Sequence, residues 1–153
     1  PELIDISEII KEVIGQYSRV AKAKQVKIFH NIPDGQKVTL QVNAVRQILS
    51  IMMDNAIKYA PQKVGEVKIW ARLNKNSVEF IVKDNGPGIS SNDQKHIFER
   101  FYRANAARTR TDASGYGLGL AIAKTLADRC GYTINIKSKP LAGAEFTLIV
   151  PRV

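Results

Sequence analysis

The chain changes character at Asp84-Asn85-Gly86-Pro87-Gly88-Ile89. Apolar and polar side chains alternate over residues 78–82 just before this segment, which predicts a strand with one buried face. Proline lacks a backbone N–H group and glycine weakens a strand, so the strand cannot continue through the segment. Gly86 and Gly88 allow backbone angles and close approaches that a side chain would block. We therefore predict a strand that ends near Asp84 and leads into a glycine-rich loop.

Asp84 has a chemistry that suits the recognition of a purine. An ionised carboxylate only accepts hydrogen bonds. It can therefore accept one from the exocyclic amine of adenine, and it repels the carbonyl that guanine carries at that position. An Asp that caps a glycine-rich turn is a common structural arrangement, so this segment alone leaves both interpretations open.

The patterns on both sides of the loop predict one α/β domain. Apolar residues recur at helical spacing over residues 7–21, 43–59 and 118–130. Ser7 and Asn43 are the expected N-caps of the first two helices, and Gly131 is the expected C-cap of the third. A short helix is expected over residues 92–103, and further strands near residues 26–28, 38–42, 67–71, 134–136 and 146–150. The predicted fold class is a two-layer α/β sandwich, a mixed five-stranded sheet with about three main helices.

Length and charge narrow the class of protein. The 153 residues fit a single domain, residues 1–153, and the absence of Met before Pro1 leads us to interpret the chain as a piece of a longer protein. A net charge of +9 favours a polyanionic partner such as a nucleotide, a nucleic acid or a phosphate surface. The one cysteine excludes an internal disulfide. No apolar run approaches the roughly 18 residues of a membrane span, and no signal peptide opens the chain.

Three further motifs carry groups that suit a nucleotide. Asn55 and Lys58 are neighbours on one side of a helix, where an amide oxygen can ligate Mg²⁺ and an ammonium can hold a phosphate. The glycines at 115, 117 and 119 open the third helix, whose free N–H groups can bind an anion. Arg100 and Arg103 offer guanidinium groups beside Phe98 and Phe101. Each motif also has a structural interpretation: a solvated helix edge, tight helix packing, or core phenylalanines with solvated arginines.

The order of the four motifs is specific. The chain contains Asn-Ala-Ile-Lys-Tyr (55–59), Asp-Asn-Gly-Pro-Gly-Ile (84–89), Phe-Glu-Arg-Phe-Tyr-Arg (98–103) and Gly-Tyr-Gly-Leu-Gly-Leu-Ala-Ile (115–122). In this order and spacing it resembles, over essentially its whole length, the catalytic ATP-binding domain of two-component sensor histidine kinases. That domain belongs to the Bergerat-fold group that includes gyrase B, Hsp90 and MutL. The Lys58-Tyr59 pair and the two-Phe motif point to the histidine kinases within this group.

The resemblance implies a set of functional residues. Asn55 would ligate Mg²⁺, and Asn55, Lys58 and Arg103 would act in catalysis. Residues 104–114 would form a flexible ATP lid. The residues expected to bind ATP are Asn55, Lys58, Tyr59, Asp84, Gly86, Gly88, Ile89, Phe98, Arg103, Gly115, Tyr116, Gly117, Leu118, Gly119 and Leu120.

The resemblance also implies partners. ATP would donate its γ-phosphoryl group to a histidine on a dimerisation domain of the same parent protein, which would then serve a response regulator. His30 and His96 lack the surroundings of an acceptor motif, so the isolated chain is expected to bind ATP without phosphorylating itself. We expect a monomeric, cytoplasmic domain that binds no nucleic acid, from a parent that can carry a membrane anchor.

Ile51 departs from the family pattern. Many histidine kinases have Asn at this position, and the ATP-hydrolysing relatives have a Glu that acts as general base. Isoleucine can neither ligate a metal nor accept a proton, so we expect little ATPase activity and weaker Mg²⁺ binding. Three alternatives stay open: a serine kinase like the anti-sigma factors, a degenerate regulatory ATP-binding module, and a basic nucleic-acid-binding module that lacks any recognised motif.

Overall fold

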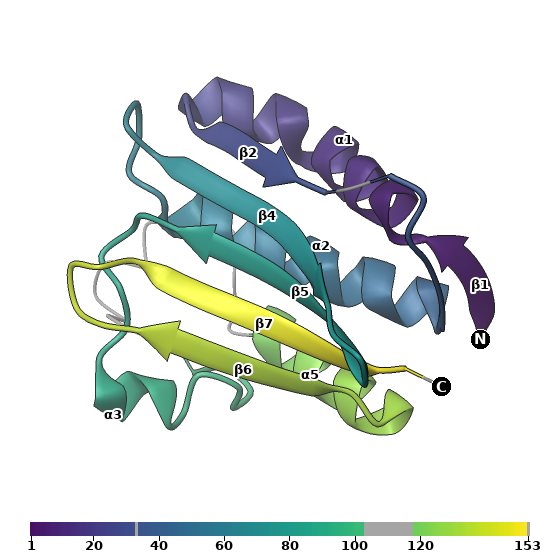
Figure 1. The fold of residues 1–153 in the computed structure, drawn as a ribbon. Coiled ribbons are helices and arrows are strands. Elements are labelled where there is room, and N and C mark those ends of the chain that lie inside the picture. Colours follow the sequence, from purple (N-terminus) through teal and green to yellow (C-terminus); the bar gives the residue numbers. More distant parts are fainter. Residues whose placement is uncertain (33, 103–117, 153) are drawn as a thin grey trace.

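A computed structural model describes residues 1–32, 34–102 and 118–152. Its centre is a five-stranded mixed sheet in the order β2-β4-β5-β7-β6 (Figure 1). The strands are β2 (Lys27–Asn31), β4 (Glu66–Leu73), β5 (Ser77–Asp84), β7 (Ala144–Pro151) and β6 (Thr133–Ser138). β2 runs parallel to β4 and the other neighbours are antiparallel. The predicted mixed five-stranded sheet is confirmed.

Three long helices form the second layer. They are α1 (Ile6–Lys24), α2 (Val42–Tyr59) and α5 (Gly119–Cys130), and they lie on one side of the sheet (Figure 1). The apolar stripe of α2 is buried, with Val45, Ile48 and Leu49 fully enclosed in the core. α5 turns the small side chains Ala123 and Ala127 inward, which lets it pack closely on α2. Pattern and packing therefore agree on a two-layer α/β sandwich.

A short strand that the pattern did not predict opens the chain. β1 (Glu2–Asp5) pairs antiparallel with β3 (Lys37–Leu40), and the two form a separate two-stranded sheet. The strand expected at residues 38–42 therefore exists over Lys37–Leu40 but lies outside the main sheet. β1 is too short and too exposed for its sequence to show clear alternation.

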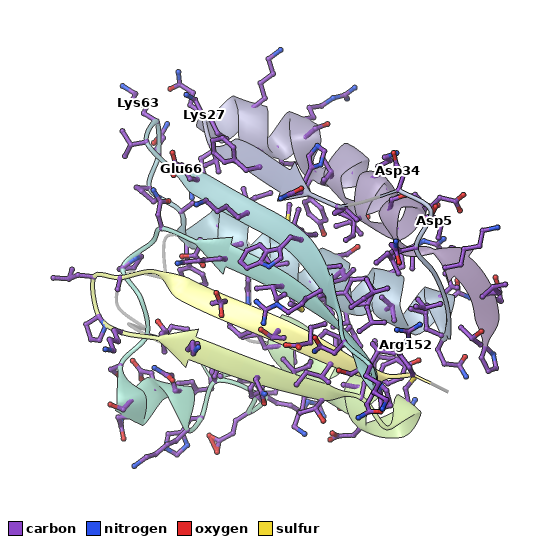
Figure 2. The ribbon with its side chains drawn as sticks, in the orientation of Figure 1. Asp5, Lys27, Asp34, Lys63, Glu66 and Arg152 are labelled. Carbon is purple, nitrogen blue, oxygen red and sulfur yellow. The ribbon has the colours of Figure 1, made fainter. Side chains whose placement is uncertain are left out.

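Both expected N-caps are wrong. Asp5 caps α1, and its Oδ1 accepts hydrogen bonds from the backbone N and the hydroxyl of Ser7 at 3.0 and 2.8 Å. These hydrogen bonds, led by the one from the Ser7 backbone, lower the pKa of Asp5. Asp5 also accepts from the Gly35 N–H beside Asp34, and Figure 2 labels both acids near the start of α1.

α2 begins at Val42, and its N-cap is Gln41, two residues before the expected Asn43, without a side-chain hydrogen bond. The side chain of Asn43 instead accepts from Arg46 Nη1 at 3.1 Å. The Tyr132 hydroxyl accepts from the Gln41 N–H at 2.9 Å, so a residue from the other end of the chain supports this helix start. α2 ends at Tyr59, as Pro61 predicts.

The helix expected over residues 92–103 is wrong beyond its first turn. α3 covers only Ser91–Gln94, and turns continue from there to Phe101. Phe101 has φ 65°, which a right-handed helix excludes, and its side chain is 66% exposed. Phe98 points the other way and packs edge-on against Phe146, with 6.4 Å between ring centroids. The two phenylalanines therefore do not share one face.

The expected C-cap of α5 is confirmed, since Gly131 ends this helix with φ 74°. Asn74-Lys75-Asn76 joins the antiparallel strands β4 and β5 as a hairpin. Within the described residues, no helix is both long and apolar enough to cross a membrane.

Candidate functional site

The end of β5 and the C-terminus of α2 meet at Asp84. The Asp84 side chain is only 5% exposed, and its Oδ1 accepts a hydrogen bond from the Gly86 backbone N–H at 2.8 Å. Burial raises the pKa of this carboxyl from its usual 3.8 to about 6. Backbone hydrogen bonds from Gly86 and Ala144 and the charge of Lys24 lower it, but they do not fully offset burial. Asp84 is therefore a buried acceptor that is mostly ionised above pH 6.

Gly86 brings the loop after β5 against the end of α2. A Cβ atom at Gly86 would lie 2.4 Å from the carbonyl oxygen of Tyr59 and 2.9 Å from Oδ1 of Asp84. No other residue fits there without moving the backbone, so this glycine sets the distance between Asp84 and the last turn of α2.

Gly88 brings the same loop against the β6–β7 hairpin. It has φ 77°, and a Cβ there would lie 2.0 Å from the carbonyl oxygen of Lys139. The next residue, Ile89, donates its N–H to Ser138 Oγ at 2.8 Å. The glycine-rich loop after β5 is thus held between two backbone segments, at Tyr59 and at Lys139. Its glycines are required by contacts within the protein, whereas the sequence alone suggested only that they allow close approach of a ligand.

The last two turns of α2 carry the expected phosphate-binding groups. Asn55 is partly exposed, and Tyr59 lies at the surface. The Lys58 side chain is 13% exposed, and its Nζ lies 3.8 Å from Oδ2 of Asp54. The pair is long and its Asp is exposed. Helical spacing places Lys58 on the same side of α2 as Asn55, three residues earlier.

The start of α5 lies against α2. A Cβ atom at Gly119 would lie 3.4 Å from Cγ2 of Ile51, one helical turn before Asn55. Leu118 is the N-cap and contributes no side-chain hydrogen bond to the helix, while Leu120 packs on the core. Four predicted site residues, Arg103, Gly115, Tyr116 and Gly117, lie outside the described residues, as do residues 104–114.

Phe98 and Ile89 hold the segment after the loop. The amide nitrogen of Gln94 donates to the carbonyl oxygens of Ile89 and Ser138 at 2.7 and 2.9 Å, which fastens α3 to the end of β6. Phe98 meets Phe146 on β7. Ile89 and Phe98 are both predicted site residues, and both make contacts within the protein that fix the position of the segment after the glycine-rich loop.

Sequence reasoning missed two residues of this region. Lys24, the last residue of α1, donates from Nζ to the carbonyl oxygens of Ile57 and Lys58 at 2.8 and 2.5 Å. Gly143, with φ 77°, would place a Cβ 2.1 Å from the carbonyl oxygen of Asp84. Both act across long sequence separations, and no local pattern signals such contacts.

Together these groups place a negative side chain at one end of the site and electropositive or metal-ligating groups at the other. A buried carboxylate lies at one end, and an amide oxygen, an ammonium and a helix N-terminus lie toward the other. Such a set suits a ligand with a hydrogen-bond donor on a flat ring and an anionic tail. Within the described chain, no three His, Cys, Asp or Glu side chains gather into a metal cage.

Comparisons with known proteins identify the family of the chain. Residues 40–153 match the family described as "Histidine kinase-, DNA gyrase B-, and HSP90-like ATPase". The sensor-like histidine kinase SenX3 of Mycolicibacterium smegmatis is 33% identical over 150 residues, covering 98% of this chain and 38% of SenX3. The chain therefore spans well under half the length of that relative.

Solved structures show the same fold. Full-length ShkA in complex with AMPPNP superposes with a TM-score of 0.84 at 29% identity, covering 99% of this chain and 31% of ShkA. Histidine kinase ThkA in complex with the response regulator TrrA gives a TM-score of 0.80 at 21% identity, covering 99% of this chain and 42% of ThkA. The chain belongs to the family of histidine kinase-, DNA gyrase B- and HSP90-like ATPases.

Proposed function

We propose that residues 1–153 form the single ATP-binding catalytic domain of a sensor histidine kinase. In this role the domain binds ATP with Mg²⁺ and presents the γ-phosphoryl group to a histidine on a dimerisation domain elsewhere in the parent protein. Family membership and the similarity to SenX3 support the class. The observation that carries the proposal is the buried carboxyl of Asp84 beside the C-terminal end of α2, which carries Asn55 and Lys58.

Asp84 reads the adenine ring. Its Oδ1 already accepts from Gly86, and a carboxylate has further lone pairs for the exocyclic amine of adenine. A guanine carbonyl at the same place would meet the negative charge without a proton to share. Gly86, Gly88 and Ile89 form the floor beneath the ring.

The phosphates lie toward Asn55 and Lys58. Mg²⁺ keeps several waters and uses only one or two protein ligands when it binds a nucleotide, so the partly exposed amide oxygen of Asn55 fits such an ion. Bound Mg²⁺ neutralises phosphate charge during transfer. Lys58 adds an ammonium. Tyr59, Phe98, Leu118, Gly119 and Leu120, with Arg103, Gly115, Tyr116 and Gly117, complete the proposed binding set.

The acceptor histidine belongs to another domain of the parent. His96 is engaged locally, with Nδ1 2.7 Å from Oε2 of Glu99 and its ring 5.3 Å from that of Tyr102. ThkA was solved with a response regulator, and we propose that this chain's parent likewise serves one. The module would act in the cytoplasm, where ATP is available.

Titration calorimetry with ATP and GTP, each with and without Mg²⁺, tests the binding proposal. We expect ATP to bind more tightly than GTP by a factor of about five or more, since rejecting a mispaired polar group is worth about 1–3 kcal/mol. Asp84→Asn should lose most of this preference, and the exposed control Asp54→Asn should retain it. Equal affinity of the wild-type chain for the two nucleotides would contradict the proposal.

A further inference from the structure

We propose that Lys24 is a positioning residue of this site, whose ammonium holds the end of α2 in place against the Asp84 loop and brings a positive charge to it. The inference rests on the proposed function, because its consequence is the affinity for an adenine nucleotide. Lys24 belongs to α1 and lies outside the four motifs that indicate the site.

The first support is the need of α2 for a partner at its C-terminus. The carbonyl of Ile57 would normally accept from the residue four positions later, which is Pro61 and has no N–H. Lys24 Nζ donates to this oxygen at 2.8 Å and to that of Lys58 at 2.5 Å. One ammonium therefore satisfies the Ile57 carbonyl, whose helical partner Pro61 cannot supply, and the Lys58 carbonyl, which loses its helical partner because α2 ends at Tyr59.

The second support is electrostatic. The C-terminus of a helix carries a partial negative charge, and Gly86 packs the Asp84 loop directly against the Tyr59 carbonyl. A buried carboxylate beside the negative end of a helix is disfavoured twice, by burial and by the dipole. The ammonium of Lys24 opposes both effects, since it binds the helix carbonyls and its charge lowers the pKa of Asp84.

The other titratable side chains come from every element around Asp84. They are Lys58 and Tyr59 on α2, Glu66 on β4, Lys83 on β5, Lys139 before the β6–β7 turn and Glu145 on β7. Glu66 lies with Lys27 and Lys63 at one end of the sheet in Figure 2. The charge of Lys24 lowers the pKa of Asp84 and so opposes the larger effect of burial.

Four variants separate charge from packing. Lys24→Met removes the charge and both hydrogen bonds, while Lys24→Gln removes the charge but keeps an N–H donor. Lys24→Arg keeps the charge. Lys22→Met is the matched control, because Lys22 is the other basic residue in the last turn of α1 and is exposed. ADP affinity is measured by calorimetry from pH 5.5 to 8.5 without Mg²⁺, so that phosphate titration is common to all proteins and cancels in ratios.

Loss of the charge should raise the pH at which ADP affinity declines. We expect Lys24→Met and Lys24→Gln to bind ADP up to about threefold more weakly than wild type at pH 6.5, because a rise of about one pKa unit from about 6 lowers the ionised fraction of Asp84 at that pH about threefold. The ratio should fall toward about twofold or less at pH 8.5, where Asp84 is ionised in every protein. Lys24→Arg and Lys22→Met should follow the wild-type profile.

Each outcome decides the inference. A Lys24→Gln ratio that is the same at every pH would show a purely structural role and overturn it, even if stability falls. If Lys24→Met does not fold, the comparison of Lys24→Gln with Lys24→Arg decides the same point. Failure of the wild-type chain to bind ADP would instead contradict the proposed function, so the two failures are distinguishable.

Discussion

A Cβ atom at Gly119 would lie 3.4 Å from the Cγ2 methyl of Ile51, so the start of α5 rests on α2 one turn before Asn55. Ile51 is partly buried and packs against the core. An apolar side chain thus occupies the place on the Asn55 face where a second polar ligand could stand. Ile51, which departs from the family pattern, therefore has a physical role: it joins α2 to the start of α5.

Ile51→Asn should strengthen the Mg²⁺-dependent part of ATP binding. One added polar contact to an ion or its water, worth about 1 kcal/mol, corresponds to about fivefold in affinity. ATP titrations with and without Mg²⁺ measure this part directly. Ile51→Leu is the control that changes shape without adding a ligand, and an equal gain in both variants would contradict the explanation.

Gly143→Ala should destabilise the domain strongly. The added Cβ would lie 2.1 Å from the Asp84 carbonyl oxygen and would also force alanine to adopt φ 77°. Gly35→Ala is a matched control, because it has φ 82° with nothing within 4 Å and so tests backbone strain alone, about 1–2 kcal/mol. Urea unfolding should show Gly143→Ala costing at least about 2 kcal/mol more than the control. Equal costs in the two variants would mean that the β6–β7 hairpin moves away from Asp84 with little loss of stability, which would contradict this prediction.

Asp84→Asn should stabilise the nucleotide-free domain at pH 8. The folded pKa of Asp84, about 6, exceeds the usual 3.8, so its favourable contribution is complete below 3.8 and is lost as pH rises through 6. The full difference corresponds to about 3 kcal/mol as an upper figure. Urea unfolding should show the variant gaining stability over wild type between pH 4 and pH 7. A constant difference across this range would show that the carboxyl does not titrate as described.

Tyr132→Phe should weaken the start of α2. The hydroxyl accepts from the Gln41 N–H at 2.9 Å, and Gln41 offers the helix no side-chain cap of its own. Loss of this hydrogen bond should cost about 1 kcal/mol in the free energy of unfolding. Tyr17→Phe, on α1, serves as the control in the same denaturant series. Equal and negligible losses in both variants would show that the Tyr132 hydroxyl does not stabilise the start of α2.

Much of the fold could be predicted because its elements show strong periodicity. The stripe of α2 and the alternation of β4 and β5 each describe one buried face, and the structure buries those faces. Asp84 could be singled out because a strand that runs into Gly-Pro-Gly must end there. These properties depend on neighbouring residues only, so they can be predicted from short stretches of sequence.

The missed features depend on distant partners. Lys24 acts on α2 more than thirty positions away, and Gly143 acts on Asp84 across the β6–β7 hairpin. The spacing of Phe98 and Phe101 suggested a helix, but a left-handed residue at 101 turns the second ring outward. Asp5 replaced Ser7 as the cap because Ser7 is buried and bonded to it. For Lys24 and Gly143 the decisive contacts are distant in sequence, whereas the cap and the turn at Phe101 depend on local geometry that the spacing of side chains does not reveal.

The most direct test of the central claim is transfer from γ-labelled ATP in the parent protein that carries this chain. We predict acid-labile, base-stable label on a histidine outside residues 1–153, and its loss in the Asp84→Asn variant. Acid-stable label on a serine of a partner protein, or no transfer from a chain that binds ATP with Mg²⁺, would contradict the account.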